Sequence, residues 1–212
     1  MAEITASLVK QLRERTAAGM MECKKALEEA RGDLGEAETI LRKRGIASAS
    51  KKGARATRQG VIGSYIHPGA QLGVLVEVNC ESDFVARTDD FQELVKDIAM
   101  QVAAADPQFI RKEDVTEDVL NREREIARDR ARNEGKPEKI LDKIVEGRLS
   151  KFYEEICLLE QPFIRDNTMT VQQLIATRIA RLGENITVAR FTRYKVGDLA
   201  GAPEPAARND GQ

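Results

Sequence analysis

The sequence predicts an α+β protein: a three-helix module followed by a core built on a three-stranded antiparallel sheet. Three observations lead to this prediction. Apolar residues recur at helical spacing in the first 45 residues, alternating segments at 60–67 and 72–78 flank a turn, and a third alternating segment lies at 186–196. The expected divisions are a three-helix module at 1–51, a basic linker at 52–59, an α+β core at 60–198 and a disordered tail at 199–212.

The first 45 residues divide into three short helices. Ile4, Leu8 and Leu12 recur at helical spacing, and a second helix is expected over about 21–31. Asp33 can cap a third helix that Gly45 should end. This pattern resembles a ubiquitin-associated-type module. The Ala-, Ser- and Lys/Arg-rich residues that follow indicate a solvated linker rather than an RNA contact.

The core combines the expected sheet with amphipathic and charged helices. A helix is expected over 90–105, since apolar residues line one face of it. A helical hairpin broken at Gly135 is expected over about 114–152, because charges that alternate in sign at 123–132 are typical of a solvated helix. His67, the single histidine, lies in the turn between the first two strands and has no partner for catalysis.

Composition excludes several classes of protein. Lys and Arg number 34 and Asp and Glu 35, and this balance argues against a general nucleic-acid binder. Cys23, Cys80 and Cys157 are too far apart for a zinc or disulfide framework, which indicates a reducing, cytoplasmic-type compartment or its organelle equivalent. Without a long apolar run, a phosphate loop or a catalytic set, we expect a non-enzyme with no cofactor, metal, membrane or direct nucleic-acid contact.

The most informative stretch lies between the second strand and the next helix. Asn79, Ser82 and Asp83 are turn formers, and Phe84 places a large aromatic side chain in that turn. The pair Asp89-Asp90 is expected to cap the following helix. Two interpretations of Phe84 remain open: a plug buried in the core, or an anchor presented to a partner.

This stretch resembles the signature of the elongation factor Ts family, Asn-Cys-Glu-Thr-Asp-Phe-Val-Ala, with Ser82 in place of Thr. The module carries a second match, since the segment around Met20-Met21 resembles the family's Arg-Thr-Gly-Ala-Gly-Met-Met-Asp-Cys-Lys-Lys-Ala-Leu. Ala17 and Glu22 depart from it. Further matching segments are Gly135-Lys136-Pro137, Val145-Glu146-Gly147-Arg148 and Gln161-Pro162-Phe163.

The resemblance implies a guanine-nucleotide exchange factor for the translation GTPase elongation factor Tu. It implies that Ser82, Asp83, Phe84 and Val85 contact the partner and disturb its Mg²⁺ site, so that GDP leaves. Asp83 would hold the turn or touch the same region. Met20 and Met21 would dock the module, through its first loop, on the GTPase domain. The chain is short for the family and is compatible with a homodimer.

Two other classes compete with this interpretation. A ubiquitin-associated-like module joined to an α+β domain could serve as a binding adaptor, but an adaptor has no need of the Asp83-Phe84-Val85 turn. A nucleic-acid binder is third, because the charge balance disfavours it.

Overall fold

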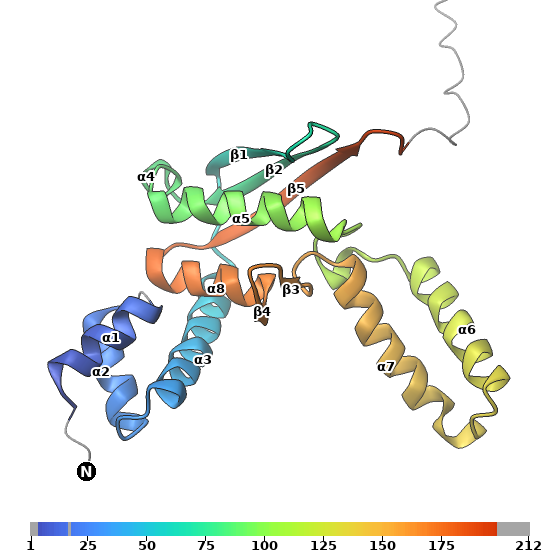
Figure 1. Ribbon diagram of the computed structural model, residues 1–212, viewed down its shortest axis with the longest axis horizontal. Helices are drawn as coiled ribbons and strands as arrows, with labels where there is room; N and C mark the ends of the chain where they lie inside the picture. Colours follow the sequence, from blue (N-terminus) through green and yellow to red (C-terminus); the bar gives the residue numbers. More distant parts are fainter. Residues whose placement is uncertain (1–3, 17, 199–212) are drawn as a thin grey trace, which may run out of the picture.

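The computed structural model describes residues 4–16 and 18–198, so the tail expected at 199–212 lies outside the described residues. A three-stranded sheet and two helices form a central body (Figure 1). The N-terminal module and a helical hairpin extend from this body as two separate arms, towards opposite ends of its longest axis. The α+β class expected from the sequence is confirmed.

The module consists of α1 (Ala6–Thr16), α2 (Met20–Glu29) and α3 (Leu34–Lys52). Asp33 caps α3 as expected, since its carboxylate accepts from the Glu36 N–H at 2.7 Å. Small and aliphatic side chains fill the space between the three helices. The fully buried ones are Leu12, Cys23, Ala26, Leu27 and Ala37.

The expected end of the third helix at Gly45 is wrong, because α3 continues to Lys52. Gly45 locally favours the end of a helix, but its packing against the rest of the fold keeps it helical. It lies against α8 (Val171–Leu182), where an added Cβ would be 3.7 Å from the Ala180 Cβ. The contact offsets the roughly 1 kcal/mol that glycine costs inside a helix. The first residue of the expected basic linker, Lys52, is therefore helical, and one helix runs from the module to the core.

The sheet has the order β1 (Gln59–Ile66), β2 (Leu72–Cys80), β5 (Ile186–Lys195), and both pairs are antiparallel. One face packs on α5 (Asp89–Ala105), with α8 beneath it (Figure 1). Valines at alternate positions of β2 supply the buried face, as period-2 patterning predicts: Val74, Val76 and Val78. At Gly63 the helix comes so close that an added Cβ would lie 2.2 Å from Val95 Cγ1.

The charged segment forms the expected hairpin, α6 (Glu117–Asn133) and α7 (Glu138–Ile156), preceded by the short 3-10 helix η1 (Lys112–Asp114). The helices bury a narrow apolar seam, and ion pairs cross it. These pairs are Arg128–Asp142 at 2.7 Å, Arg132–Glu138 at 2.9 Å and Arg148–Glu123 at 2.8 Å. No helix within 4–16 and 18–198 is long and apolar enough to span a membrane.

A short ribbon, β3 (Pro162–Phe163) and β4 (Asp166–Thr170), was not predicted. Two buried amide side chains fix it to the core. Gln101 on α5 donates to Gln161 at 3.1 Å and to the Pro162 carbonyl at 3.2 Å. Gln161 in turn donates to the Glu155 carbonyl at 3.0 Å, which ties the base of the hairpin to the central body.

Candidate partner-binding site

The turn after β2 is a single helical turn, α4 (Asp83–Ala86). Ser82 caps it, and its hydroxyl accepts from the Val85 N–H at 3.4 Å. The predicted cap at Asp89-Asp90 is wrong: Thr88 caps α5, accepting from the Phe91 N–H at 3.3 Å. The two aspartates fill the first turn of α5 instead, where negative charge favours the helix dipole.

Phe84 projects into solvent from α4 and is 77% exposed. The alternative of a buried plug is therefore wrong. Ala86 is the residue of this turn that is buried, and Val85 is half-buried against the core. A single helical turn cannot bury all its sides, and anchoring Val85 and Ala86 leaves Phe84 outward. Asp83 pairs with Arg87 at 2.8 Å on the same turn, although both side chains are well exposed and such pairs contribute little.

Met20 and Met21 lie in the first turn of α2, not in the preceding loop as expected. They are 50% and 62% exposed and do not fill the module's core, which Cys23 and Leu27 fill from the same helix. The module thus presents two adjacent flexible apolar side chains to solvent. Both α2 and α4 lie towards the same end of the molecule's longest axis, away from the hairpin (Figure 1). One large partner could therefore contact both.

Cys80 lies directly beneath α4 and is fully buried. Its thiol donates to the Ser82 carbonyl at 3.1 Å. Burial, with the nearby Glu184 carboxylate adding to it, raises the pKa of this thiol above its ordinary value. The thiol is consequently protonated at neutral pH and serves packing rather than chemistry. Among the described residues, no group of three His, Cys, Asp or Glu side chains is placed to hold a metal ion.

Comparison with known families gives a match that includes every residue the structure describes. The family described as "Elongation factor TS" matches residues 2–198.

The chain belongs to the elongation factor Ts family.

Individual elongation factor Ts proteins are similar over almost their full length. The protein named elongation factor Ts in Solibacter usitatus is 75% identical over 202 residues, 95% of each chain. That of Koribacter versatilis is 63% identical over 92% of this chain and 90% of its own. That of Moorella thermoacetica is 58% identical over 92% and 96%. Membership supports the role that the signature implies, nucleotide exchange on elongation factor Tu in translation elongation.

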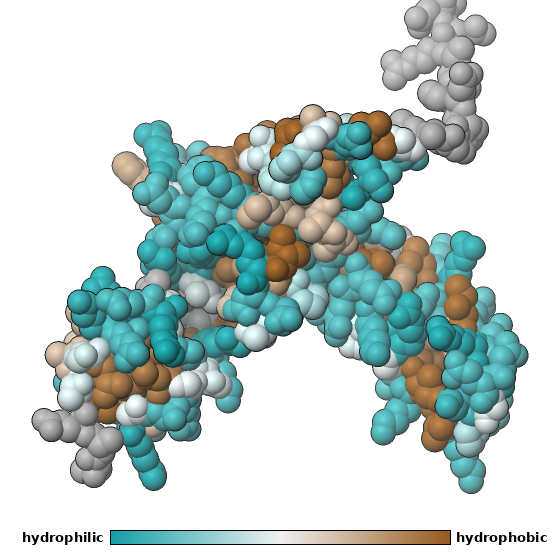
Figure 2. All heavy atoms as spheres, in the orientation of Figure 1, coloured by the Kyte–Doolittle hydropathy of each residue, from teal (hydrophilic) through white to brown (hydrophobic). Residues whose placement is uncertain are grey.

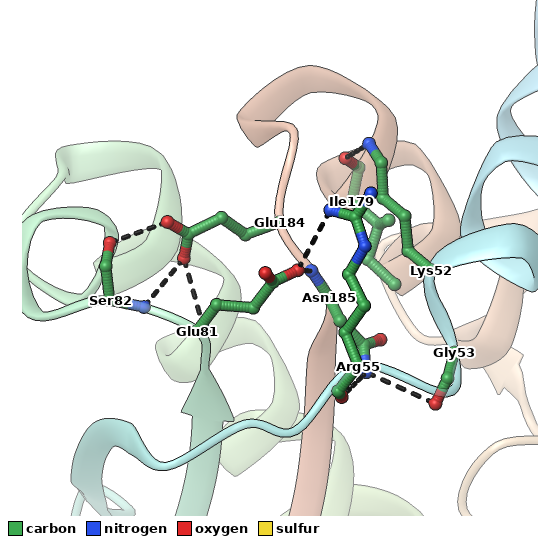
Figure 3. A network of polar contacts seen from close by, with 8 residues as sticks. All are labelled: Lys52, Gly53, Arg55, Glu81, Ser82, Ile179, Glu184 and Asn185. Atoms are coloured by element: carbon green, nitrogen blue, oxygen red, sulfur yellow. Dashed lines mark hydrogen bonds and ion pairs between the residues drawn. The ribbon is translucent and has the colours of Figure 1, made fainter.

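The sequence did not predict the polar network behind α4 (Figure 3). Glu184, in the loop between α8 and β5, accepts hydrogen bonds from Ser82. Between the same two loops, the Asn185 N–H donates a hydrogen bond to the Glu81 carboxylate. The partners are 102 to 104 positions apart in the chain, so no local pattern could have indicated them. The one available signal was a charged residue, Glu184, placed between a helix-ending glycine and a strand.

Proposed function

We propose that this chain releases GDP from elongation factor Tu by inserting Phe84 beside the Mg²⁺ that the partner holds with its nucleotide. The observation that carries the proposal is a large aromatic side chain, 77% exposed, on a short helix fixed to the sheet. Aromatic side chains are enriched among the few residues that supply most of the binding energy of an interface. Ser82 and Val85 hold the turn, and Asp83 extends beside Phe84.

The mechanism is differential binding. A factor shifts an equilibrium only by binding one state better than the other. Phe84 fits the nucleotide-free partner, in which the Mg²⁺ contact is already lost, better than the GDP-bound partner. By reciprocity, the factor lowers the partner's affinity for GDP and Mg²⁺ by the same ratio by which GDP and Mg²⁺ lower the partner's affinity for the factor. No covalent step and no side-chain proton transfer is needed.

The module contributes affinity in this proposal. The exposed pair Met20 and Met21 docks on an apolar helix surface of the partner, where unbranched thioether side chains adapt to irregular contacts. Because α3 continues from the module onto α8, the pair is held at a defined position relative to α4.

The direct test is release of labelled GDP from purified elongation factor Tu, with and without this protein. We expect acceleration that rises with the concentration of the factor and then saturates. Release at the spontaneous rate, with or without binding, would refute the exchange role. Binding without acceleration is the result expected of the adaptor that the sequence left as an alternative.

A charge at the methionine pair should weaken binding while leaving the fold intact. Met21→Asp places a carboxylate where the interface excludes water, and an unpaired buried charge is costly. The concentration for half-maximal exchange should rise at least about tenfold, the factor that corresponds to ~1.4 kcal/mol. Release at saturation and the melting temperature should not change. Ile140→Asp, at an exposed isoleucine on the distant hairpin, is the matched control and should exchange as the unaltered protein does.

We also propose that two copies of the chain associate through the open face of the sheet. One face is buried by α5, while the other exposes apolar side chains from all three strands: Ile62, Ile66, Leu75 and Tyr194, from 48% to 71% exposed. Hydrophobic residues are visible over the sheet, among polar ones, in the space-filling view (Figure 2). An exposed apolar patch of this kind, which shares its face with the Glu77–Arg190 ion pair, is typical of an interaction surface. The strand β5, which contributes Tyr194, is an edge strand of the sheet. A second copy offers an identical patch, which a two-fold axis can match to the first.

Leu75→Asp should shift the chain towards monomer. Leu75 lies on the central strand, so a charge there falls in the middle of the patch. Light scattering at tens of micromolar (roughly, for a weak complex) should give twice the chain mass for the unaltered protein and the single chain mass for the variant. Ile126→Asp on the hairpin is the control and should not change the mass. An unaltered protein that is monomeric at this concentration would contradict the proposal.

A further inference from the structure

Phe84 can act as an anchor only if α4 is held in one orientation. A helix of four residues has little stability of its own, because nucleating the first turn is unfavourable and no further turns follow to offset that cost. Its ion pair between Asp83 and Arg87 is solvent-exposed and adds little. The direction of Phe84 must therefore be set by contacts that reach α4 from the rest of the fold.

One carboxylate makes most of those contacts at the start of α4 (Figure 3). The Ser82 hydroxyl donates to Glu184 Oε1 at 2.6 Å. The Ser82 and Glu81 backbone N–H groups donate to Glu184 Oε2 at 3.0 and 3.1 Å. Glu184 is half-buried, so these hydrogen bonds are partly shielded from water, and bonds to an ionised acceptor are the stronger kind.

Glu184 is itself held in place. Gly183 before it adopts a left-handed conformation, with φ of 80°, which ends α8 and turns the chain towards Glu81. The contact is reciprocal, since the Asn185 N–H donates to Glu81 Oε1 at 2.6 Å. Each loop therefore offers a carboxylate to the backbone of the other.

The same network includes the end of α3. The Asn185 side chain donates to the Arg55 carbonyl at 2.8 Å and to the Gly53 carbonyl at 3.4 Å. Arg55 pairs with Glu81 at 3.4 Å. Three chain segments thus meet behind α4: the end of the module's last helix, the end of β2 and the start of β5.

We infer that Glu184 is the positioning residue for Phe84: its carboxylate fixes the start of α4 and thereby the direction in which the aromatic ring is presented. The inference rests on the proposed function, in which Phe84 acts on the partner. Glu184 touches no partner atom in this role and acts through the backbone of residues 81 and 82 and through the Ser82 hydroxyl.

The variant Glu184→Ala removes all three hydrogen bonds at the start of α4. The saturating rate of GDP release should fall about tenfold or more, because small misplacements of a positioned group are costly. The concentration for half-maximal exchange, which depends on the module, should change little. Backbone amides of Glu81 and Ser82 should exchange hydrogen faster, while amides of α5 keep their protection. Glu160→Ala, which removes another half-buried carboxylate from its partner Lys112, is the matched control and should keep the full rate.

Glu184→Gln separates positioning from charge. A glutamine oxygen can accept from both backbone N–H groups, and its amide can donate to the Ser82 hydroxyl. This variant should recover most of the rate lost in Glu184→Ala. Failure to recover would overturn the hydrogen-bonding basis of the inference.

A double substitution decides whether Glu184 acts through Phe84. In a Phe84→Ala background, Glu184→Ala should cause no further loss, whereas a general loss of folded protein would lower the residual rate again. If Phe84→Ala releases GDP slowly but Glu184→Ala releases it at the normal rate, the positioning role of Glu184 is refuted and the proposed function is not. A Phe84→Ala variant with normal exchange would refute the proposed function itself, and with it this inference.

Discussion

Replacing Phe84 by Ala should abolish most of the acceleration of GDP release while leaving the fold unchanged. The side chain is 77% exposed, so its removal costs the free protein few contacts, and the free energy of unfolding should change by no more than about 0.5 kcal/mol. In the complex the same removal deletes an aromatic anchor. Anchors of this kind typically contribute ~2 kcal/mol or more to binding. We therefore expect the acceleration of GDP release to fall roughly 30-fold.

Thermal melting and GDP release of Phe84→Ala, measured side by side, test this expectation. Raising free Mg²⁺ should also weaken binding of the unaltered protein to the GDP-bound partner, because Mg²⁺ and the anchor oppose each other. That dependence should be smaller for Phe84→Ala. Normal melting together with normal exchange would rule out Phe84 as the group that releases GDP.

Replacing Phe91 by Ala should, in contrast to Phe84→Ala, strongly destabilise the fold. Phe91 lies only seven positions further along the chain but is fully buried in the main core, beneath the sheet. Its removal leaves a cavity, and buried Phe→Ala substitutions cost about 3–5 kcal/mol. For a chain of this size, the melting temperature should fall by roughly 6–20 °C.

Differential scanning calorimetry of Phe91→Ala beside Phe91→Leu measures the loss. The leucine variant retains most of the volume and should lose much less. A Phe91→Ala protein that melts within a degree or two of the unaltered one would contradict the burial of this ring. Phe91→Ala thus tests a residue that stabilises the fold, and Phe84→Ala tests a residue that acts on the partner.

The elements that the sequence predicted well are those whose periodic pattern continues over many residues. The alternation at 60–67, 72–78 and 186–196 predicted three strands, and they form one sheet. The amphipathic segment that became α5 is equally clear, since its buried side chains recur along 17 residues. Phe84 was identified as a candidate from its type and its place in a turn, but its exposure required the structure.

What the sequence could not predict depends on contacts between distant segments. Gly45 indicated a helix end, yet α3 continues because Ala180 supports it from α8. The strand β3 has only two residues, too few for any alternation to appear. The place of Glu184 between a helix-ending glycine and a strand does not reveal its role, because that role exists only once β2 and the loop after α8 are brought together.

The three cysteines have a practical consequence. Each is fully buried and each belongs to a different apolar cluster: Cys23 to the module, Cys80 to the main core and Cys157 to the base of the hairpin. Burial raises the pKa of all three thiols, that of Cys157 to about 11. A thiol in this state reacts with an alkylating reagent only after its surroundings open. The chain therefore carries three natural reporters, and alkylation rates resolved by peptide would show which part opens first and which part a bound partner holds closed.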